Sequence, residues 1–327
     1  MGLVSYGLYL PEHYETAEAV AARAGMSVEE CLALGIELRY APSHSDHPVP
    51  MAKKAAVQAF ERAGKVTPEE VDLVLWAGEE YKDYIAQTAS IRLQEEVGCK
   101  NAWAFDLVGQ GVTSIQALRL AHDMIVGDRT VRTVLIAGGT RNIDLVDSAN
   151  PDTRFLLPAS ASGSAMIVQR GYRNNRLLST AFIVDAAMAD EVYVPGGGTE
   201  HPFTPENLHS PMRYFTTPNP EKTAAYLSDR WPQALAAVVK KALGGQRLDY
   251  LALRHLSNAH RSMVLSLLGV SEAQSPSLNR YGHHGPNDAV LSLHLGLESG
   301  RIEEGSVVAM AMAGIGFTYA SAVLRWG

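Results

Sequence analysis

The chain has 327 residues, of which 46% are hydrophobic and 19% are charged. Since a typical domain has roughly 150 residues, this length predicts two domains or one large α/β unit and excludes a peptide-sized module. The apolar fraction excludes a largely disordered chain, and a net charge of −7 with no long basic run argues against nucleic-acid binding.

Cysteine content and the N-terminus bear on the compartment. Cys31 and Cys99 are too few for a disulfide framework and lack metal-ligand spacing, so we expect no metal site. Residues 1–11 have no basic segment followed by an apolar stretch, and no window holds the roughly 18 apolar residues that a membrane helix needs. These features predict a cytoplasmic protein in a reducing compartment.

Amphipathic helix patterns alternate with short apolar runs along the chain. The residues predict a helix over 51–63 that ends at Gly64, a strand over 71–77, and strands over 131–139 and 160–169. Later segments repeat this order: a helix over 231–243 that ends at Gly244, then strands over 248–254, 306–312 and 317–325. Continuous apolar strands between helices predict mixed sheets covered on both faces.

The repeated order has an offset of about 175 residues, which favours two similar halves. The sequence GYRNNR around residue 172 separates two apolar runs, so we divide the chain into halves 1–172 and 173–327. A drift of similar composition could also produce such an echo, and this alternative stays open.

A glycine-rich strand-to-helix junction is the first candidate for chemistry. Residues 106–118 read DLVGQGVTSIQAL, and we expect a helix whose first turn holds Gly111, Thr113 and Ser114. The N–H groups at a helix N-terminus favour an anion or a nucleophile. Close packing of helix against sheet is the alternative reason for these glycines.

A second candidate is YGHHGPND at residues 281–288, just before a helix predicted over 289–297. A carboxylate such as Asp288 can orient an imidazole such as His283 and so create a general base. In the alternative interpretation Asp288 or Asn287 caps the helix and the histidines are solvated.

A third cluster, RHLSNAHR, follows the strand predicted over 248–254 and includes Ser257. Polar residues after a buried strand indicate a pocket wall, because α/β sheets carry their sites at this edge. A polar loop without a function is the alternative.

Six segments together resemble the thiolase superfamily, specifically the 3-oxoacyl-(acyl-carrier-protein) synthase III (KAS III) family. They are GIELR at 35–39, NAWAFDL at 101–107, ASGSAMIV at 161–168, VPGGGTEHP at 194–202, YGH at 281–283 and AGIGFTYASAVLRW at 313–326. The resemblance implies an α/β thiolase-like fold, in which two duplicated βαβαβαββ halves form a five-layer αβαβα sandwich. It also implies a dimer.

The resemblance implies a catalytic Cys at a helix N-terminus and an oxyanion hole formed with a glycine-rich loop. Here Gly111 stands at the Cys position and Gly314 and Gly316 lie in the loop. The family's His would fall on Ser257 and its Asn on His283, so the chain is an atypical member without the catalytic Cys. Some KAS III-like acyltransferases of polyketide pathways carry a His and an Asp at the spacing of His283 and Asp288.

The leading hypothesis is an acyltransferase or thioester-processing enzyme that acts on an acyl-CoA or an acyl-carrier protein without another cofactor. His283, oriented by Asp288, would be the general base, with Gly111, Gly314 and Gly316 around the oxyanion. Thr113 or Ser114 could replace the missing nucleophile. The alternatives are a catalytically inactive subunit that scaffolds an active homologue in a heterodimer, and a Cys-independent lyase of thiolase fold.

Overall fold

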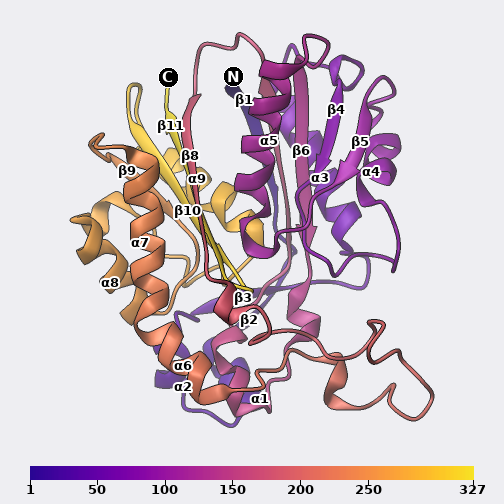
Figure 1. Ribbon diagram of the computed structural model, residues 1–327, viewed down its shortest axis with the longest axis vertical. Coiled ribbons are helices and arrows are strands. Elements are labelled where there is room, and N and C mark those ends of the chain that lie inside the picture. The colour runs from indigo at the N-terminus through magenta and orange to yellow at the C-terminus, as the bar shows by residue number, and fades with distance from the viewer.

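Strands and helices alternate through most of the chain in the computed structural model, which describes residues 1–327 (Figure 1). The strands are β1 (Gly2–Tyr9), β2 (His13–Thr16), β3 (Leu38–Ala41), β4 (Leu73–Trp76), β5 (Trp103–Asp106), β6 (Thr133–Thr140), β7 (Ser162–Gln169), β8 (Arg176–Val184), β9 (Tyr250–Leu253), β10 (Val307–Gly314) and β11 (Thr318–Arg325). The α-helices are α1 (Ala17–Ala24), α2 (Val28–Ala33), α3 (Pro48–Ala63), α4 (Ala89–Val97), α5 (Thr113–Gly127), α6 (Pro220–Ser228), α7 (Arg230–Leu243), α8 (Asn258–Leu268) and α9 (Asp288–Glu298).

The main sheet has nine strands whose order mirrors itself about the neighbours β1 and β8. The order is β5-β4-β6-β7-β1-β8-β11-β10-β9. Outward from each central strand, two antiparallel pairings are followed by a parallel one. Within the sheet, β1 and β8 pair at a single position, Gly2 with Arg176. The expected fold of duplicated, helix-covered halves is therefore confirmed.

Three apolar cores define five layers. Along β4, Val74 and Trp76 face a core shared with α3 and α4, whereas Leu73 and Leu75 face a central core that holds α5 and α9. The C-terminal half repeats this alternation, because Tyr250 and Ala252 of β9 face the central core and its other residues face α7 and α8. Side chains of a strand point alternately to its two faces, so each half-sheet lies between two helical layers.

The predicted helices and strands are confirmed, with small differences at their ends. α3 begins at Pro48, where proline is tolerated in the first helical turn, and its carboxyl end is capped by Gly64. α7 ends at Gly244, whose left-handed backbone (φ 57°) favours glycine. The helix predicted from Gly111 begins as a 3₁₀ turn, Gln110–Val112, and the α-helix α5 starts at Thr113.

The C-terminal half has one strand fewer than its mirror image, because nothing pairs with β9 in the place that β5 takes beside β4. The segment between α8 and α9 contains Pro276, which has no backbone N–H for a ladder. The carbonyl of Asn279 accepts hydrogen bonds from the N–H groups of Glu37 and Leu38 instead. This pairing ties the segment to the start of β3.

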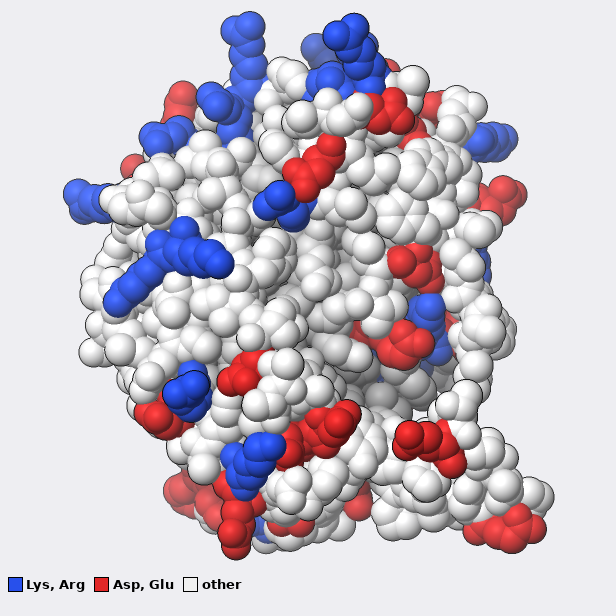
Figure 2. Space-filling model, in the orientation of Figure 1, with Lys and Arg blue, Asp and Glu red and all other residues white.

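The molecule has distinct ends in the view of Figure 1. Both termini lie at the upper end, where Figure 2 shows Lys and Arg side chains gathered, while β2, β3, α1 and α2 lie at the lower end. A long connection between β8 and α6 projects from the lower end. None of the helices combines the length and the apolar character needed to cross a membrane. The predicted boundary at residue 172 lies in the turn between β7 and β8.

Candidate functional site

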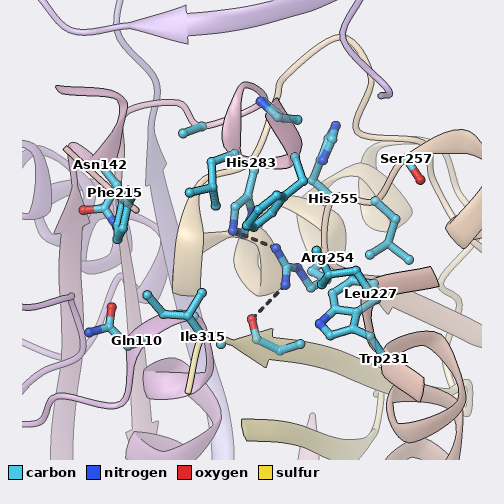
Figure 3. A pocket seen from close by; sticks show the side chains of 18 of the residues that line it. Gln110, Asn142, Phe215, Leu227, Trp231, Arg254, His255, Ser257, His283 and Ile315 are labelled. Atoms are coloured by element: carbon cyan, nitrogen blue, oxygen red, sulfur yellow. Dashed lines mark hydrogen bonds between the residues drawn. The ribbon is translucent and has the colours of Figure 1, made fainter. Parts of the chain in front are cut away.

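A cavity of about 170 Å³ lies where the carboxyl end of β9, the end of β10 and the start of α5 meet (Figure 3). Most of its wall is apolar, and polar groups come from several distant segments of the chain. Residues that these segments contribute to the wall include Gly111, Arg254, His283 and Gly314. A mostly apolar pocket with a few convergent polar groups is typical of a small-molecule site.

His283 and Asp288 form the pair that the sequence predicts. Asp288, the first residue of α9, is fully buried, and its Oδ2 lies 2.5 Å from His283 Nδ1. The same carboxylate accepts hydrogen bonds from the N–H groups of His255 (2.9 Å) and His284 (2.8 Å). The carboxylate therefore orients the imidazole, and the alternative of a side-chain helix cap is not what the structure shows, since α9 has no such cap.

Arg254 occupies the cavity side of His283, and sequence reasoning did not identify it. Its Nη2 lies 2.8 Å from His283 Nε2 and its Nη1 donates to the carbonyl of Ala313 at 3.0 Å, as Figure 3 shows. A guanidinium only donates, so Nε2 accepts and Nδ1–H donates to Asp288. The available signal was its position directly after a predicted strand.

The electrostatics of the site favour a neutral imidazole. Burial lowers the pKa of His283 and the charge of Arg254 lowers it further, against the opposing effect of Asp288. Burial raises the pKa of the Asp288 carboxyl, but His283, His284 and Arg254 together lower it by more, so Asp288 stays ionised. His283 is thus an uncharged imidazole held in one tautomer, with its lone pair toward the cavity.

Two of the three glycines that the sequence predicts around an oxyanion lie in the cavity wall. Gly111 and Gly314 both line the cavity, whereas Gly316 does not. A Cβ atom at Gly111 would lie 2.4 Å from the carbonyl oxygen of Ala313, so the end of β10 leaves no room for a side chain there.

The predicted substitute nucleophiles do not line the cavity. Thr113 is fully buried, and its hydroxyl donates to the carbonyl of Gln110 at 2.6 Å. Ser114 is also buried, and its Oγ has no hydrogen-bond partner. Neither hydroxyl is placed to attack a molecule bound beside His283.

Ser257, the third residue predicted to be catalytic, lies at the start of α8. It lies on the cavity wall, but its hydroxyl accepts a hydrogen bond from the N–H of His260 at 3.3 Å and so caps α8. Figure 3 shows it apart from His283, whose neighbour is Arg254. The hydroxyl is engaged by the helix because serine favours the position before a first turn.

Both cysteines lie away from the cavity. Cys31 and Cys99 are fully buried, and neither is part of the wall. Burial raises the pKa of the Cys99 thiol to about 12 and also raises that of Cys31. Both are therefore protonated, packed thiols, which react poorly. No group of three or more His, Cys, Asp or Glu side chains is arranged to hold a metal ion.

Comparison with known proteins gives matches over part or all of the chain. Residues 239–326 match the model of the C-terminal domain of 3-oxoacyl-[acyl-carrier-protein] synthase III. The beta-ketoacyl-[acyl-carrier-protein] synthase III of Desulfitobacterium hafniense is 25% identical, over 100% of this chain and 98% of that protein.

Solved structures match along the full length. The synthase III of Thermus thermophilus has a TM-score of 0.85 and 22% identity, covering 100% of this chain and 99% of that one. OleA of Xanthomonas campestris, solved with lauric acid and lauroyl-CoA, has a TM-score of 0.83 and 15% identity, covering 99% and 98%. The chain thus has the thiolase-like fold of these structures, and its C-terminal residues 239–326 are similar to the C-terminal domain of the synthase III family.

Proposed function

We propose that this protein is an atypical KAS III-like acyltransferase that acts on an acyl-CoA or acyl-carrier-protein thioester without a covalent Cys intermediate. The observation that carries the proposal is the His283–Asp288 pair at 2.5 Å, set in a cavity beside Gly111 rather than beside a nucleophile. A matching relative is named beta-ketoacyl-[acyl-carrier-protein] synthase III, and the similar OleA was solved with bound lauroyl-CoA.

The transfer begins when the thioester carbonyl takes over hydrogen bonds from Arg254. In the structure, Arg254 donates to His283 Nε2, which occupies the lone pair that a general base needs. A carbonyl oxygen beside the guanidinium offers it a different acceptor and releases Nε2. Arg254 then polarises the carbonyl, and N–H groups of the Gly111 and Gly314 region complete the donors for the developing oxyanion.

The acceptor, a hydroxyl, an amine or water, attacks the polarised carbonyl carbon while His283 Nε2 takes its proton. Asp288 stabilises the resulting imidazolium, as a carboxylate does in a Ser-His-Asp triad. The tetrahedral intermediate collapses, the carbon–sulfur bond breaks and a thiolate departs. The thiolate takes up one proton and His283 gives up the proton that it took from the acceptor, so the acylated acceptor and a free thiol leave. All of these steps use side-chain and backbone groups of this chain, the thioester and the acceptor.

The test is release of free thiol from a panel of acyl-CoA esters, with and without amine and alcohol acceptors. We expect His283→Ala to lose at least roughly 10²-fold in kcat, the lower end of the contribution of general bases. His201→Ala, at an exposed histidine of the projecting connection, is the matched control and should be unchanged. Unchanged turnover in His283→Ala would overturn the proposed role.

A second candidate is a non-catalytic subunit paired with an active homologue. It is favoured by the absence of space for any side chain at Gly111 and by the bond from Arg254 to the would-be base. Purification from the native host decides between the two. A homodimer with turnover supports the enzyme, whereas a heterodimer in which only the partner turns over supports the scaffold.

A further inference from the structure

Glu79 is a buried carboxyl group in the cavity wall that the steps above do not use. It follows β4, and β4 runs parallel to β6, so Glu79 lies at the edge where both strands end. Only 5% of the residue is exposed. The carboxyl ends of parallel strands are where α/β proteins assemble their sites.

The carboxyl group of Glu79 is held by one oxygen only. Thr140 Oγ1, at the end of β6, donates to Oε2 at 2.8 Å, and Asn142 Nδ2 donates to the same atom at 2.5 Å. Oε1 takes part in no hydrogen bond, and it is not completely enclosed by other atoms. One oxygen is thus anchored, and the other is accessible and free to carry a proton.

The turn that carries His283 makes room for this carboxyl group. Gly285 has a left-handed backbone (φ 55°), and a Cβ atom there would lie 2.8 Å from Glu79 Oε1. The second glycine of the YGHHGPND segment therefore fits against Glu79, while Asp288 three residues later holds His283. One short segment positions both groups.

The surroundings of Glu79 favour a protonated carboxyl near neutral pH. Burial raises its pKa to about 7, while the hydrogen bond from Thr140 and the charge of Arg254 oppose this shift and Asp288 adds to it. No Lys or Arg forms an ion pair with it. An acid or base is most effective when its pKa lies near the working pH.

We propose that Glu79 is the general acid of the reaction and donates the Oε1 proton to the sulfur of the departing thiol. This proposal rests on the proposed acyl transfer. The acceptor gives its proton to His283, the carbon–sulfur bond breaks, and the thiolate receives the proton of Glu79. His283 and Glu79 regain their starting states when the proton on the imidazolium returns to the carboxylate, so that charges and atoms balance.

The two roles need opposite protonation states, which defines a pH window. His283 must be neutral, and its pKa is lowered from its ordinary value; Glu79 must be protonated, and its pKa is about 7. The rate should therefore fall on the alkaline side near pH 7 as Glu79 ionises. Glu79→Gln should remove this alkaline limb and leave the acidic one.

The decisive experiment varies the leaving group. The wild type and Glu79→Gln are compared on two thioesters with the same acyl group, one of CoA and one of thiophenol, whose more acidic thiol departs without a proton. We expect Glu79→Gln to lose roughly 10²-fold in kcat on the CoA ester and less than about threefold on the thiophenyl ester. Glu80→Gln, at the exposed neighbour, is the matched control and should behave as wild type.

Each outcome has one meaning. An equal loss on both esters, or an alkaline limb that persists in Glu79→Gln, overturns the general acid while leaving the acyl transfer intact. Absence of turnover in the wild type on both esters contradicts the proposed function, and the role of Glu79 with it. Selective loss on the CoA ester together with loss of the alkaline limb supports the proposal.

Discussion

At the scale of single residues, the site is a chain of hydrogen bonds whose direction is set by the groups at its two ends. Asp288 can only accept and Arg254 can only donate, so His283 between them has one possible tautomer. The charge of Arg254 lowers the pKa of His283, whereas Asp288 raises it. Removing either end should change the protonation of His283 in a defined direction.

The replacement Arg254→Gln should raise the pKa of His283. Burial, the largest influence, stays in place, but the charge that lowers the pKa disappears while Asp288 still raises it. Titration of the histidine side chains by NMR measures the change, with Arg230→Gln at an exposed arginine as the control. A His283 pKa that is unchanged or lowered in Arg254→Gln would contradict this account.

The sequence predicts one of these two hydrogen bonds, the one between His283 and Asp288, and not the one from Arg254. The five-residue spacing of His283 and Asp288 lies within one turn-and-helix segment, so local structure alone brings the two together. Arg254 is 29 residues away from His283, and only the sheet brings it there. Ser257 is predicted from the position of the family's His, and it also lies on the cavity wall, but position after a strand does not show which side chain contacts His283.

At the scale of elements, the contact between the start of α5 and the end of β10 decides what chemistry is possible. The two segments approach so closely that the site of a Cβ atom at Gly111 is already occupied by the Ala313 carbonyl, at 2.4 Å. A side chain at this position requires the strand end or the helix start to move. The close packing of the end of β10 against the start of α5 thus leaves no room for a nucleophilic side chain at Gly111.

Gly111→Ala should destabilise the protein by about 1–3 kcal/mol, the usual cost of overpacking a tight site. Gly127→Ala, at the other end of α5, is the control, because nothing lies within 4 Å of a Cβ atom there. Alanine is the better helix former by up to about 1 kcal/mol, so this variant should be neutral or stabilised. Thermal unfolding of both variants measures the difference, and equal melting temperatures would refute the steric explanation.

Most helices and strands could be predicted because their signals are local. α7 shows an apolar face followed by Gly244-Gly245, and β9 is a short apolar run, so the pattern and the stop signal are within a few residues. The lack of a further strand beside β9 could not be predicted in the same way. The segment that would supply it pairs through Asn279 with residues near β3, which are more than 200 positions away in the chain.

At the scale of the whole molecule, buried titratable groups connect stability to pH. Burial lowers the pKa of His255 and His284 to about 4, whereas it raises that of Glu79 to about 7. In the unfolded chain these groups titrate near 6.5 for His and 4.3 for Glu. The two histidines therefore stabilise the fold above pH 6.5 and lose this contribution as the pH falls toward 4.

Between about pH 4.5 and 6.5, the unfolded chain binds two more protons at His255 and His284 and one fewer at Glu79. The free energy of unfolding should therefore rise with pH by about 1.4 kcal/mol per unit from these three groups. In Glu79→Gln the opposing contribution is gone, so the slope should be steeper by about 1.4 kcal/mol per pH unit. Denaturant unfolding across this range measures both slopes, and a shallower slope in the variant would contradict the assignment.

The sequence by itself determined the order of helices and strands, the repeat of two halves and the pairing of His283 with Asp288. Periodicity, glycine stop signals and short-range spacing are properties of neighbouring residues, and these features need nothing else. The tertiary structure decided that Arg254 covers His283, that Gly111 has no room for a side chain and that Glu79 reaches the cavity. Each of these depends on strand ends that are distant in the chain and come together only when the sheet halves pack around α5 and α9.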